Sequence, residues 1–352
     1  MTRQLNHILY EKTPVLFRAV AFGRDGRPWH LFQQAWGGER ENVRAGQIIE
    51  ARVRALGNDG GVFLDHIGWK LWQGGFEPLY CDRKHSNGLR EGQTLLVKVL
   101  SAGRRDHAAK VAPYDGKQER SHPGDAFAEW ASALAVDRVE TASSDHADLI
   151  DTAFDEAVIE RLALPDGGAI YFERTRALTA IDVDAADRRT RGSASARALS
   201  LNKSAVSEVA RQISLRGLGG LFAVDCVEPL NDHARGTIRD ALIEAVKAHD
   251  RRPINVLKPS KFGLLEASVA WRDRPIDEAL GQSDIKLALE LKAAHREMMH
   301  DKGGLYTLAL VESVYEAYLM RKSVVEDELQ AYFHGRLIIE RVIPEQEGLK
   351  RR

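Results

Sequence analysis

Cysteine is nearly absent from this chain, since Cys81 and Cys226 are the only two in 352 residues. No Cys-x-x-Cys pair occurs, which argues against both a disulfide framework and a thiolate zinc site. No apolar run approaches the ~18 residues that cross a bilayer, and residues 1–10 lack the apolar core of a signal peptide. We therefore expect a cytoplasmic protein with no membrane partner and no zinc.

An excess of charge of one sign is also missing. Lys and Arg number 50 and Asp and Glu 51, giving a net charge of −1. This balance excludes an all-basic surface, so any nucleic-acid site has to be a local patch. At roughly 100–200 residues per domain, the length indicates two or three domains.

The N-terminal third is expected to be β structure. Two short apolar runs, 16–20 and 29–33, flank a hairpin signal at 23–26. Further short runs separated by turn signals are typical of a small five-stranded barrel of the oligonucleotide-binding type. Its candidate strands are 48–56, 62–64, 74–79, 94–100 and 108–112.

An α/β pattern follows the polar stretch 115–124, and a mostly helical tail follows the α/β pattern. The α/β elements expected are helices 149–162, 198–213 and from Asn231 or Asp232 to about 249, and strands 169–173, 177–183, 221–227 and 254–257. The tail is expected to hold helices 285–299 and 308–318 and a last strand, 337–342.

Acidic residues interrupt two apolar strands near their C-terminal ends. Asp182 lies in 180–184 and Asp225 in 221–227, and Asp184 faces the same way as Asp182 because strand side chains alternate. We interpret both strands as fully buried, and the carboxyl edge of such strands is where α/β sites form. Converging carboxylates would bind a hard cation such as Mg²⁺. Alternatively, each aspartate ends its strand and caps the next turn.

Basic residues concentrate between these two strands. Residues 186–216 carry seven basic and two acidic side chains, which suits a phosphodiester substrate. Arg188, Arg189 and Arg191 stand in an expected loop, where functional residues are frequent. The alternative is a solvated helix face, the usual role of a charge run.

Aromatic residues stand near the turns of the expected barrel. Phe63, Trp69, Trp72 and Phe76 could stack on the bases of single-stranded RNA. The alternative is that these rings pack in the core.

Taken together, four segments resemble the catalytic core of the ribonuclease E/G family. They read ALTAIDV at 177–183, TRG at 190–192, ARQISLRGLGGLFAVD at 210–225 and SKFGLLE at 260–266. The expected barrel resembles the S1 domain of that family more loosely, through VFLD at 62–65 and GFEPL at 75–79.

The resemblance implies an endonuclease that cleaves single-stranded RNA to 5′-phosphate and 3′-hydroxyl ends. Asp182 and Asp225 match the two aspartates that hold the catalytic Mg²⁺ of the family, with Mn²⁺ as an alternative metal. In the family, an Asn stands two residues after the first of these aspartates. Asp184 takes its place here, and could add a ligand or position a water. Phe63 and Phe76 match the S1 aromatics of the family.

Two parts of the family pattern are missing. The Cys-Pro-x-Cys zinc-link and the long insertion that senses a 5′-monophosphate have no counterpart. Any homo-oligomer is then expected to form without zinc. The resemblance implies five regions: 1–45, a β-hairpin region packing on the core; 46–114, the S1-like barrel; 115–164, a linker and reduced ribonuclease-H-like part; 165–280, the catalytic α/β core; and 281–352, a helical small domain.

The sequence thus predicts a Mg²⁺-dependent endoribonuclease of RNA processing or decay. Asp182, Asp225 and Asp184 would be catalytic. RNA would contact Phe63, Phe76 and the basic residues Arg188, Arg189, Arg191 and Lys203. The alternative is an RNA-binding protein that uses the barrel and the basic loop without cleaving.

Overall fold

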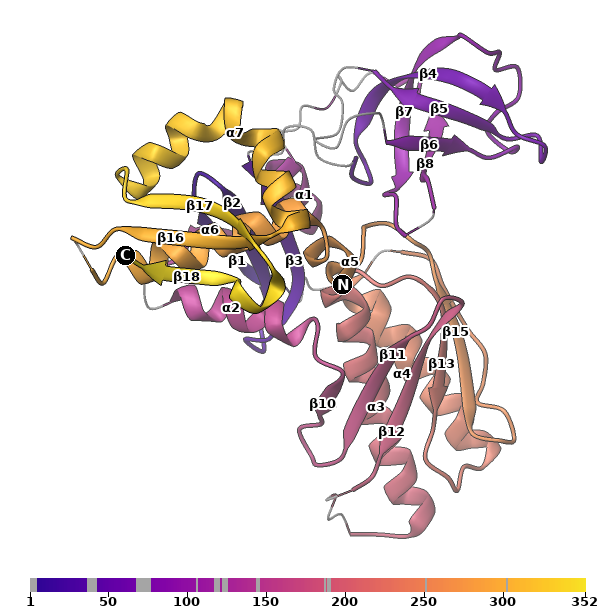
Figure 1. Ribbon diagram of the computed structural model, residues 1–352. Coiled ribbons are helices and arrows are strands. Elements are labelled where there is room, and N and C mark those ends of the chain that lie inside the picture. Colours follow the sequence, from indigo (N-terminus) through magenta and orange to yellow (C-terminus); the bar gives the residue numbers. More distant parts are fainter. Residues whose placement is uncertain are drawn as a thin grey trace. The chain divides into compact units, whose positions relative to one another are not determined.

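The structure, a computed structural model, describes residues 5–36, 43–67, 77–105, 107–116, 121, 126–143, 146–186, 188, 191–250, 252–301 and 303–352 (Figure 1). The chain divides into two compact units. One consists of Met1–Leu9, Val20–Leu31 and Val136–Ile276, and the other of Tyr10–Ala19, Phe32–Ala135 and Asp277–Arg352.

The N-terminal residues form a four-stranded sheet in the order β3-β2-β1-β9. The strands are β1 (Leu5–Lys12), β2 (Leu16–Gly23), β3 (Pro28–Ala35) and β9 (Arg138–Thr141). The predicted hairpin joins β2 to β3, where the Gly23 amide bonds to the Arg27 carbonyl at 2.9 Å. Gly26 has φ +75°, a conformation that favours glycine. Helices α1 (Ala126–Leu134) and α2 (Ala147–Glu156) flank β9 in the sequence.

The predicted five-stranded barrel is confirmed. It closes in the order β4-β5-β6-β8-β7. Its strands are β4 (Ile48–Leu56), β5 (Val62–His66), β6 (Pro78–Cys81), β7 (Thr94–Ser101) and β8 (Ala109–Pro113). Alternate side chains such as Ile49, Leu64 and Val97 fill the interior, so the outward positions are free for contacts.

A six-stranded sheet forms the α/β core in the order β10-β11-β12-β13-β15-β14, in which only β12 and β13 are parallel. Its strands are β10 (Arg161–Ala163), β11 (Ala169–Arg174), β12 (Leu178–Asp184), β13 (Gly220–Asp225), β14 (Ile254–Val256) and β15 (Leu264–Val269). Helices α3 (Ala194–Leu215) and α4 (Asp232–His249) cover one face and share a hydrophobic core with it (Figure 1).

Both helices begin at side-chain caps. The Ser193 hydroxyl accepts from the Ala196 amide, and Asn231 Oδ1 accepts from the Ala234 amide. Such caps satisfy amides that the first turn leaves unpaired. Of the two predicted caps for α4, Asn231 is the one used.

One predicted helix is too long. The pattern over 149–162 predicted a single helix, but α2 ends at Glu156, and Arg161 and Leu162 lie in β10. Leu162 pairs with Ile170 in the sheet and is 6% exposed. Leu162 is therefore buried as part of the sheet. Over a few residues, the spacing of apolar positions does not distinguish a strand from a helix.

The C-terminal segment is not simply helical, and this corrects the predicted fold class. Besides α5 (Ile276–Leu280), α6 (Ser283–Met298) and α7 (Glu312–Phe333), it contains a three-stranded sheet ordered β17-β16-β18. The sheet consists of β16 (Tyr306–Val311), β17 (Leu337–Val342) and β18 (Gly348–Arg351), and a short 3₁₀ turn, η4 (Pro344–Gln346), precedes β18. Residues 308–311, predicted to begin a helix, belong to β16, because a short apolar run fits either structure.

Among the helices of the described residues, none is both long enough and apolar enough to cross a membrane.

Candidate functional site

The three predicted acidic residues lie on the face of the core sheet opposite α3 and α4. Ile181, Val183 and Val224 point into the helical layer. The alternating positions Asp182, Asp184 and Asp225 therefore point to the other face, where Asp182 and Asp225 are exposed. The interpretation of these strands as fully buried was wrong, since Leu221 on this open face is 57% exposed.

The parallel register of β12 and β13 brings two carboxylates together. Asp182 is the Cα partner of Asp225, so both side chains project from neighbouring strands on one face. Neighbouring strands lie about 4.8 Å apart, and carboxylates at that separation can share one cation. The same closeness would make them repel one another without a cation.

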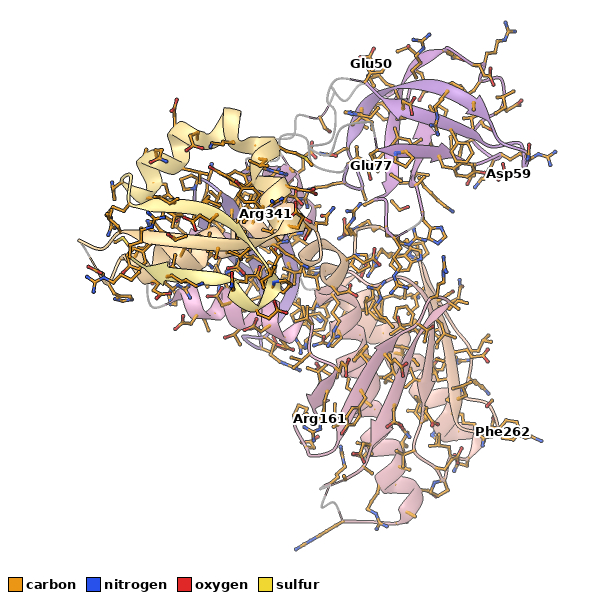
Figure 2. The ribbon with its side chains drawn as sticks, in the orientation of Figure 1. Glu50, Asp59, Glu77, Arg161, Phe262 and Arg341 are labelled. Atoms are coloured by element: carbon orange, nitrogen blue, oxygen red, sulfur yellow. The ribbon has the colours of Figure 1, made fainter. Side chains whose placement is uncertain are left out.

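The pair stands in a row of five residues that crosses the open face. In order of strands, the row is Arg161, Tyr171, Asp182, Asp225 and Leu264. Arg161 Nε donates to the Tyr171 hydroxyl at 3.1 Å (Arg161 is labelled in Figure 2). Neither residue was predicted from the sequence, although a tyrosine within the apolar run 169–172 was a signal for an exposed position.

Asp184 is engaged locally. Its Oδ1 accepts a hydrogen bond from the Ala186 amide at 2.8 Å, and its side chain is half-buried. This bond is the turn-capping role that the sequence left open as an alternative. Within the part of the chain that the structure describes, no three His, Cys, Asp or Glu side chains are grouped to hold a metal.

The donor set fits Mg²⁺ nonetheless. Mg²⁺ is commonly held by one or two carboxylates, several waters and the substrate phosphate, and not by a complete protein cage. Asp182 and Asp225 supply two carboxylates on an exposed face, where water and a phosphate can approach. The residues present therefore suit a metal that the substrate helps to bind.

Asn202 of α3 fixes the chain just after Asp225. Its Nδ2 donates to the Val227 carbonyl at 2.8 Å, and its Oδ1 accepts from the Val227 amide at 3.0 Å. The side chain is 0% exposed, so water does not compete for these bonds. Sequence reasoning missed this residue, because an isolated asparagine in a helix gives no signal of its partner.

The basic loop before α3 is divided in its contacts. The Arg188 side chain is only 4% exposed and donates to the Gly167 carbonyl and the Ser200 hydroxyl. Arg191 and Lys203 are exposed, whereas Arg189 lies outside the described residues. RNA can thus reach Arg191 and Lys203 without breaking a bond that the structure records.

The barrel displays aromatic and basic side chains on its outer surface. Phe63 is half-buried, is the Cα partner of Tyr80, and has its ring centroid 5.2 Å from the Tyr80 ring. The next position across the barrel is Lys110, which is exposed. Tyr80 and Lys110 were not predicted from the sequence, because only the pairing of β6 with β5 and β8 aligns them with Phe63. Phe76, Trp69 and Trp72 lie outside the described residues.

Tyr80 is held in place by Asp59, which lies in the turn between β4 and β5. The Tyr80 hydroxyl donates to Asp59, and this bond, with burial second, raises the pKa of Tyr80 to about 12. The hydroxyl therefore keeps its proton at neutral pH, and the ring presents no charge that would repel RNA.

The two cysteines are free and buried. Burial raises the pKa of Cys81 to about 11 and that of Cys226 to about 12. Because the thiolate is the form that binds metals and reacts, neither cysteine is suited to either role at neutral pH.

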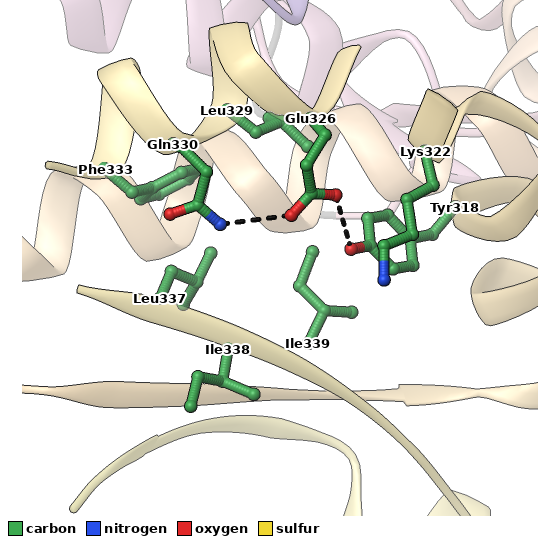
Figure 3. A pocket seen from close by; sticks show the side chains of 9 residues that line it. All are labelled: Tyr318, Lys322, Glu326, Leu329, Gln330, Phe333, Leu337, Ile338 and Ile339. Atoms are coloured by element: carbon green, nitrogen blue, oxygen red, sulfur yellow. Dashed lines mark hydrogen bonds between the residues drawn. The ribbon is translucent and has the colours of Figure 1, made fainter. Parts of the chain in front are cut away.

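A pocket of about 250 Å³ lies between α7 and β17, and none of the predicted site residues lines it (Figure 3). Inside it, Glu326 accepts from the Tyr318 hydroxyl at 3.0 Å and from Gln330 Nε2 at 3.1 Å. Burial, and then the bond to Glu326, raises the pKa of Tyr318. These polar groups satisfy one another, so the pocket offers little to orient a ligand. It is lined by Tyr318, Lys322, Glu326, Leu329, Gln330, Phe333, Leu337, Ile338 and Ile339.

The fold and the site define a class of protein: an oligonucleotide-binding type of barrel joined in one chain to an α/β core with paired carboxylates. Residues 83–271 match the model of the Ribonuclease E/G family, which is more than half of the chain. The chain belongs to the ribonuclease E/G family.

Curated relatives agree over a shorter segment. The chain is 39% identical to ribonuclease E of Buchnera aphidicola subsp. Schizaphis graminum over 135 residues, 38% of this chain and 13% of that protein. It is 37% identical to ribonuclease E of Escherichia coli over 134 residues, 38% and 12% respectively. It is 32% identical to ribonuclease E of Haemophilus influenzae over 163 residues, 46% and 17%. The matched segment thus spans less than a fifth of each relative.

Proposed function

We propose that this protein is a Mg²⁺-dependent endoribonuclease that cleaves single-stranded RNA to 5′-phosphate and 3′-hydroxyl ends. The observation that supports this most directly is the registered pair Asp182 and Asp225 on the open face of the core sheet. Family membership supports the same reaction class.

Asp182 and Asp225 would hold the metal, either Mg²⁺ or Mn²⁺. When bound, such an ion lowers the pKa of a coordinated water and neutralises charge on the scissile phosphate. The parallel register of β12 and β13 keeps both carboxylates on one exposed face. Asn202 fixes the backbone two residues beyond Asp225. Asp184 caps the turn that leads from β12 into the basic loop.

Single-stranded RNA would be bound at two kinds of contact. Phe63 and Tyr80 offer ring faces on the barrel, with Lys110 beside them for a phosphate. Arg191, in the loop after β12, and Lys203, on α3, would neutralise further phosphates of the RNA. Phe76 and Arg189 belong to the same proposal, and Arg188 supports the loop through its bonds to Gly167 and Ser200.

RNA binding without cleavage is the second candidate function. It is favoured by the engagement of Asp184 with the Ala186 amide, which leaves two carboxylates for the metal where the sequence suggested a third. The barrel would bind RNA whether or not the core is active.

Incubation of the purified protein with an end-labelled unstructured RNA separates the two functions. With Mg²⁺ we expect internal cleavage to fragments that carry a 5′-phosphate, and with EDTA we expect binding alone. Binding without cleavage in both Mg²⁺ and Mn²⁺ would establish the second function and refute the first. We also propose that any homo-oligomer forms without zinc, and we expect it to persist when a zinc chelator is added.

A further inference from the structure

Phe262 is exposed to a degree that packing does not explain. Its side chain is 91% exposed, whereas the next most exposed large apolar side chain among the described residues, Leu257, is 62% exposed. A phenylalanine in water forgoes the burial that normally stabilises it, and a ring this exposed leaves a π face open on which a base can stack. Figure 2 shows it at the periphery of the core sheet.

The turn that carries Phe262 is well ordered by hydrogen bonds. The Ser260 amide donates to the Leu264 carbonyl at 2.8 Å, and the Gly263 amide donates to the Ser260 carbonyl at 3.1 Å. The Phe262 amide donates to the Ser260 hydroxyl at 3.2 Å. The ring is therefore presented by a preorganised backbone, which lowers the entropy cost of binding to it.

The same turn is tied to the strand that ends at Asp225. The Cys226 amide donates to the Gly263 carbonyl at 3.1 Å, and Leu264 is the Cα partner of Asp225. Gly263 has φ +81°, and a Cβ there would lie 2.9 Å from the Cys226 carbonyl oxygen. Only glycine allows this close approach, and it places Phe262 two residues from the position beside the carboxylate pair.

An exposed lysine precedes Phe262 in the turn. Lys261 is exposed, whereas Lys258 Nζ lies 3.3 Å from Asp232 Oδ2 and is partly exposed. An aromatic face beside a lysine matches the two parts of a nucleotide, because the base stacks and the phosphate is neutralised. A purely apolar partner would gain nothing from the lysine.

We propose that Phe262 stacks on the base of an RNA nucleotide next to the bond that is cleaved, and that Lys261 contacts the phosphate of that nucleotide. This inference rests on the proposed function, since it assigns a substrate contact in the turn beside the same carboxylate pair. It adds a base-holding residue on the Asp225 side of the carboxylate pair.

The test measures RNA affinity in an Asp225→Asn background, so that binding is read without cleavage. Phe262→Ala should weaken binding of a short unstructured RNA about tenfold, or 1.4 kcal/mol. Phe262→Trp should keep the RNA affinity of the wild type. Phe262→Leu should lose it, because leucine keeps the apolar surface but lacks a π face. Ile343→Ala, at a position 59% exposed and distant in sequence, is the matched control and should bind normally.

A second readout places the contact along the RNA. Removing single bases from the RNA, one position at a time, should weaken binding to the Phe262-containing protein at one position near the cleaved bond. Phe262→Ala should be insensitive at that position. Equal sensitivity of both proteins at every position, or normal affinity of Phe262→Ala, would overturn the inference while cleavage by the wild type stands. Normal RNA binding by Phe262→Leu would show that the contact needs no π face and would also overturn the inference. Failure of the wild type to bind or cleave RNA at all would refute the proposed function itself.

Discussion

Both polar atoms of the Asn202 side chain are hydrogen-bonded to the backbone of Val227, and the residue is fully buried. A buried amide that loses its partner costs about 1–3 kcal/mol, and here the partner is the backbone that follows Asp225. We therefore expect Asn202 to act as a positioning residue for the Asp225 carboxylate.

We predict that Asn202→Ala lowers the rate of cleavage at saturating RNA by roughly tenfold, a barrier change of about 1.4 kcal/mol, and leaves RNA affinity unchanged. The affinity and the rate are measured separately, by a binding titration and by single-turnover cleavage. Asn6→Ala, at an exposed position of β1, serves as the control. A loss of affinity with an unchanged rate would show that Asn202 does not act through Asp225.

Asp184 separates two interpretations of the third carboxylate. If its main role is the bond to the Ala186 amide, Asp184→Asn should keep that bond through the amide oxygen and retain cleavage to within about threefold, a change below 1 kcal/mol. Asp184→Ala should lower the stability by about 1 kcal/mol through loss of the turn. A loss of cleavage in Asp184→Asn as large as that expected for Asp182→Asn would show that the charge of Asp184 is required.

At the scale of elements, α3 is attached to its surroundings by a buried ionic cluster. Arg211 is 1% exposed and donates to Glu208, Glu156 and the Pro28 carbonyl. Burial alone would raise the pKa of Glu208, but the hydrogen bond and charge of Arg211, with Arg27, outweigh it and lower that pKa. Removing one member of such a cluster leaves a buried charge without compensation.

Stability should therefore fall on acidification, and His30 contributes to the loss. Burial, more than the nearby arginines, lowers the pKa of His30 from 6.5 to about 4. Between these values the unfolded chain binds a proton that the folded protein excludes, so lower pH favours unfolding. The lowered pKa of Glu208 has the same sign, and its contribution is lost as pH falls below the ordinary value of 4.5.

We expect the free energy of unfolding to decrease between pH 6.5 and 4, with roughly 3 kcal/mol of that decrease due to His30. His30→Gln, whose side chain does not titrate, should show a correspondingly shallower pH dependence in urea unfolding. The exposed His300→Gln should behave as the wild type. Parallel pH profiles for wild type and His30→Gln would contradict the assignment.

Elements with a strong local pattern were predictable from the sequence, but which strands pair with one another was not. The barrel followed from short runs and turn residues, and the strands of Asp182 and Asp225 from apolar runs broken by a charge. The parallel register that joins the two aspartates, the row through Arg161 and Tyr171, and the alignment of Tyr80 with Lys110 depend on which strands pair. Strand pairing is non-local, and a single chain carries little signal of it.

The open face shows why burial on two sides of a strand was wrongly inferred. Ala180, Leu221 and Ala223 read as core residues, but they lie on the face that α3 and α4 do not cover. An apolar composition marks a strand and does not say how many of its faces are packed. The prediction of a helix over 308–318 was wrong at β16 for a similar reason, because residues Tyr306–Leu310 of that strand are all buried.

At the scale of the whole molecule, recognition should rest on internal contacts and not on an RNA end. Only residues 114–125 separate β8 from α1, which is too short for a separate phosphate-binding subdomain. A tenfold preference for one 5′ end would require about 1.4 kcal/mol from contacts with that end.

We predict that one RNA sequence is cleaved at rates within tenfold of each other whether its 5′ end carries a monophosphate, a triphosphate or a hydroxyl. A circular version of the same RNA should be cleaved as well. A preference for the monophosphate well above tenfold would reveal an end-binding site outside the contacts described above.

One measurement tests directly whether Asp182 and Asp225 hold the catalytic metal. Asp182→Asn, Asp225→Asn and the wild type are compared in two assays on the same unstructured RNA, affinity without metal and cleavage with Mg²⁺. We expect both variants to bind RNA like the wild type and to cleave it at least roughly 10²-fold more slowly, because the metal supplies several kcal/mol of charge stabilisation. Near-normal cleavage by both variants would contradict the assignment of Asp182 and Asp225 as the metal-binding pair.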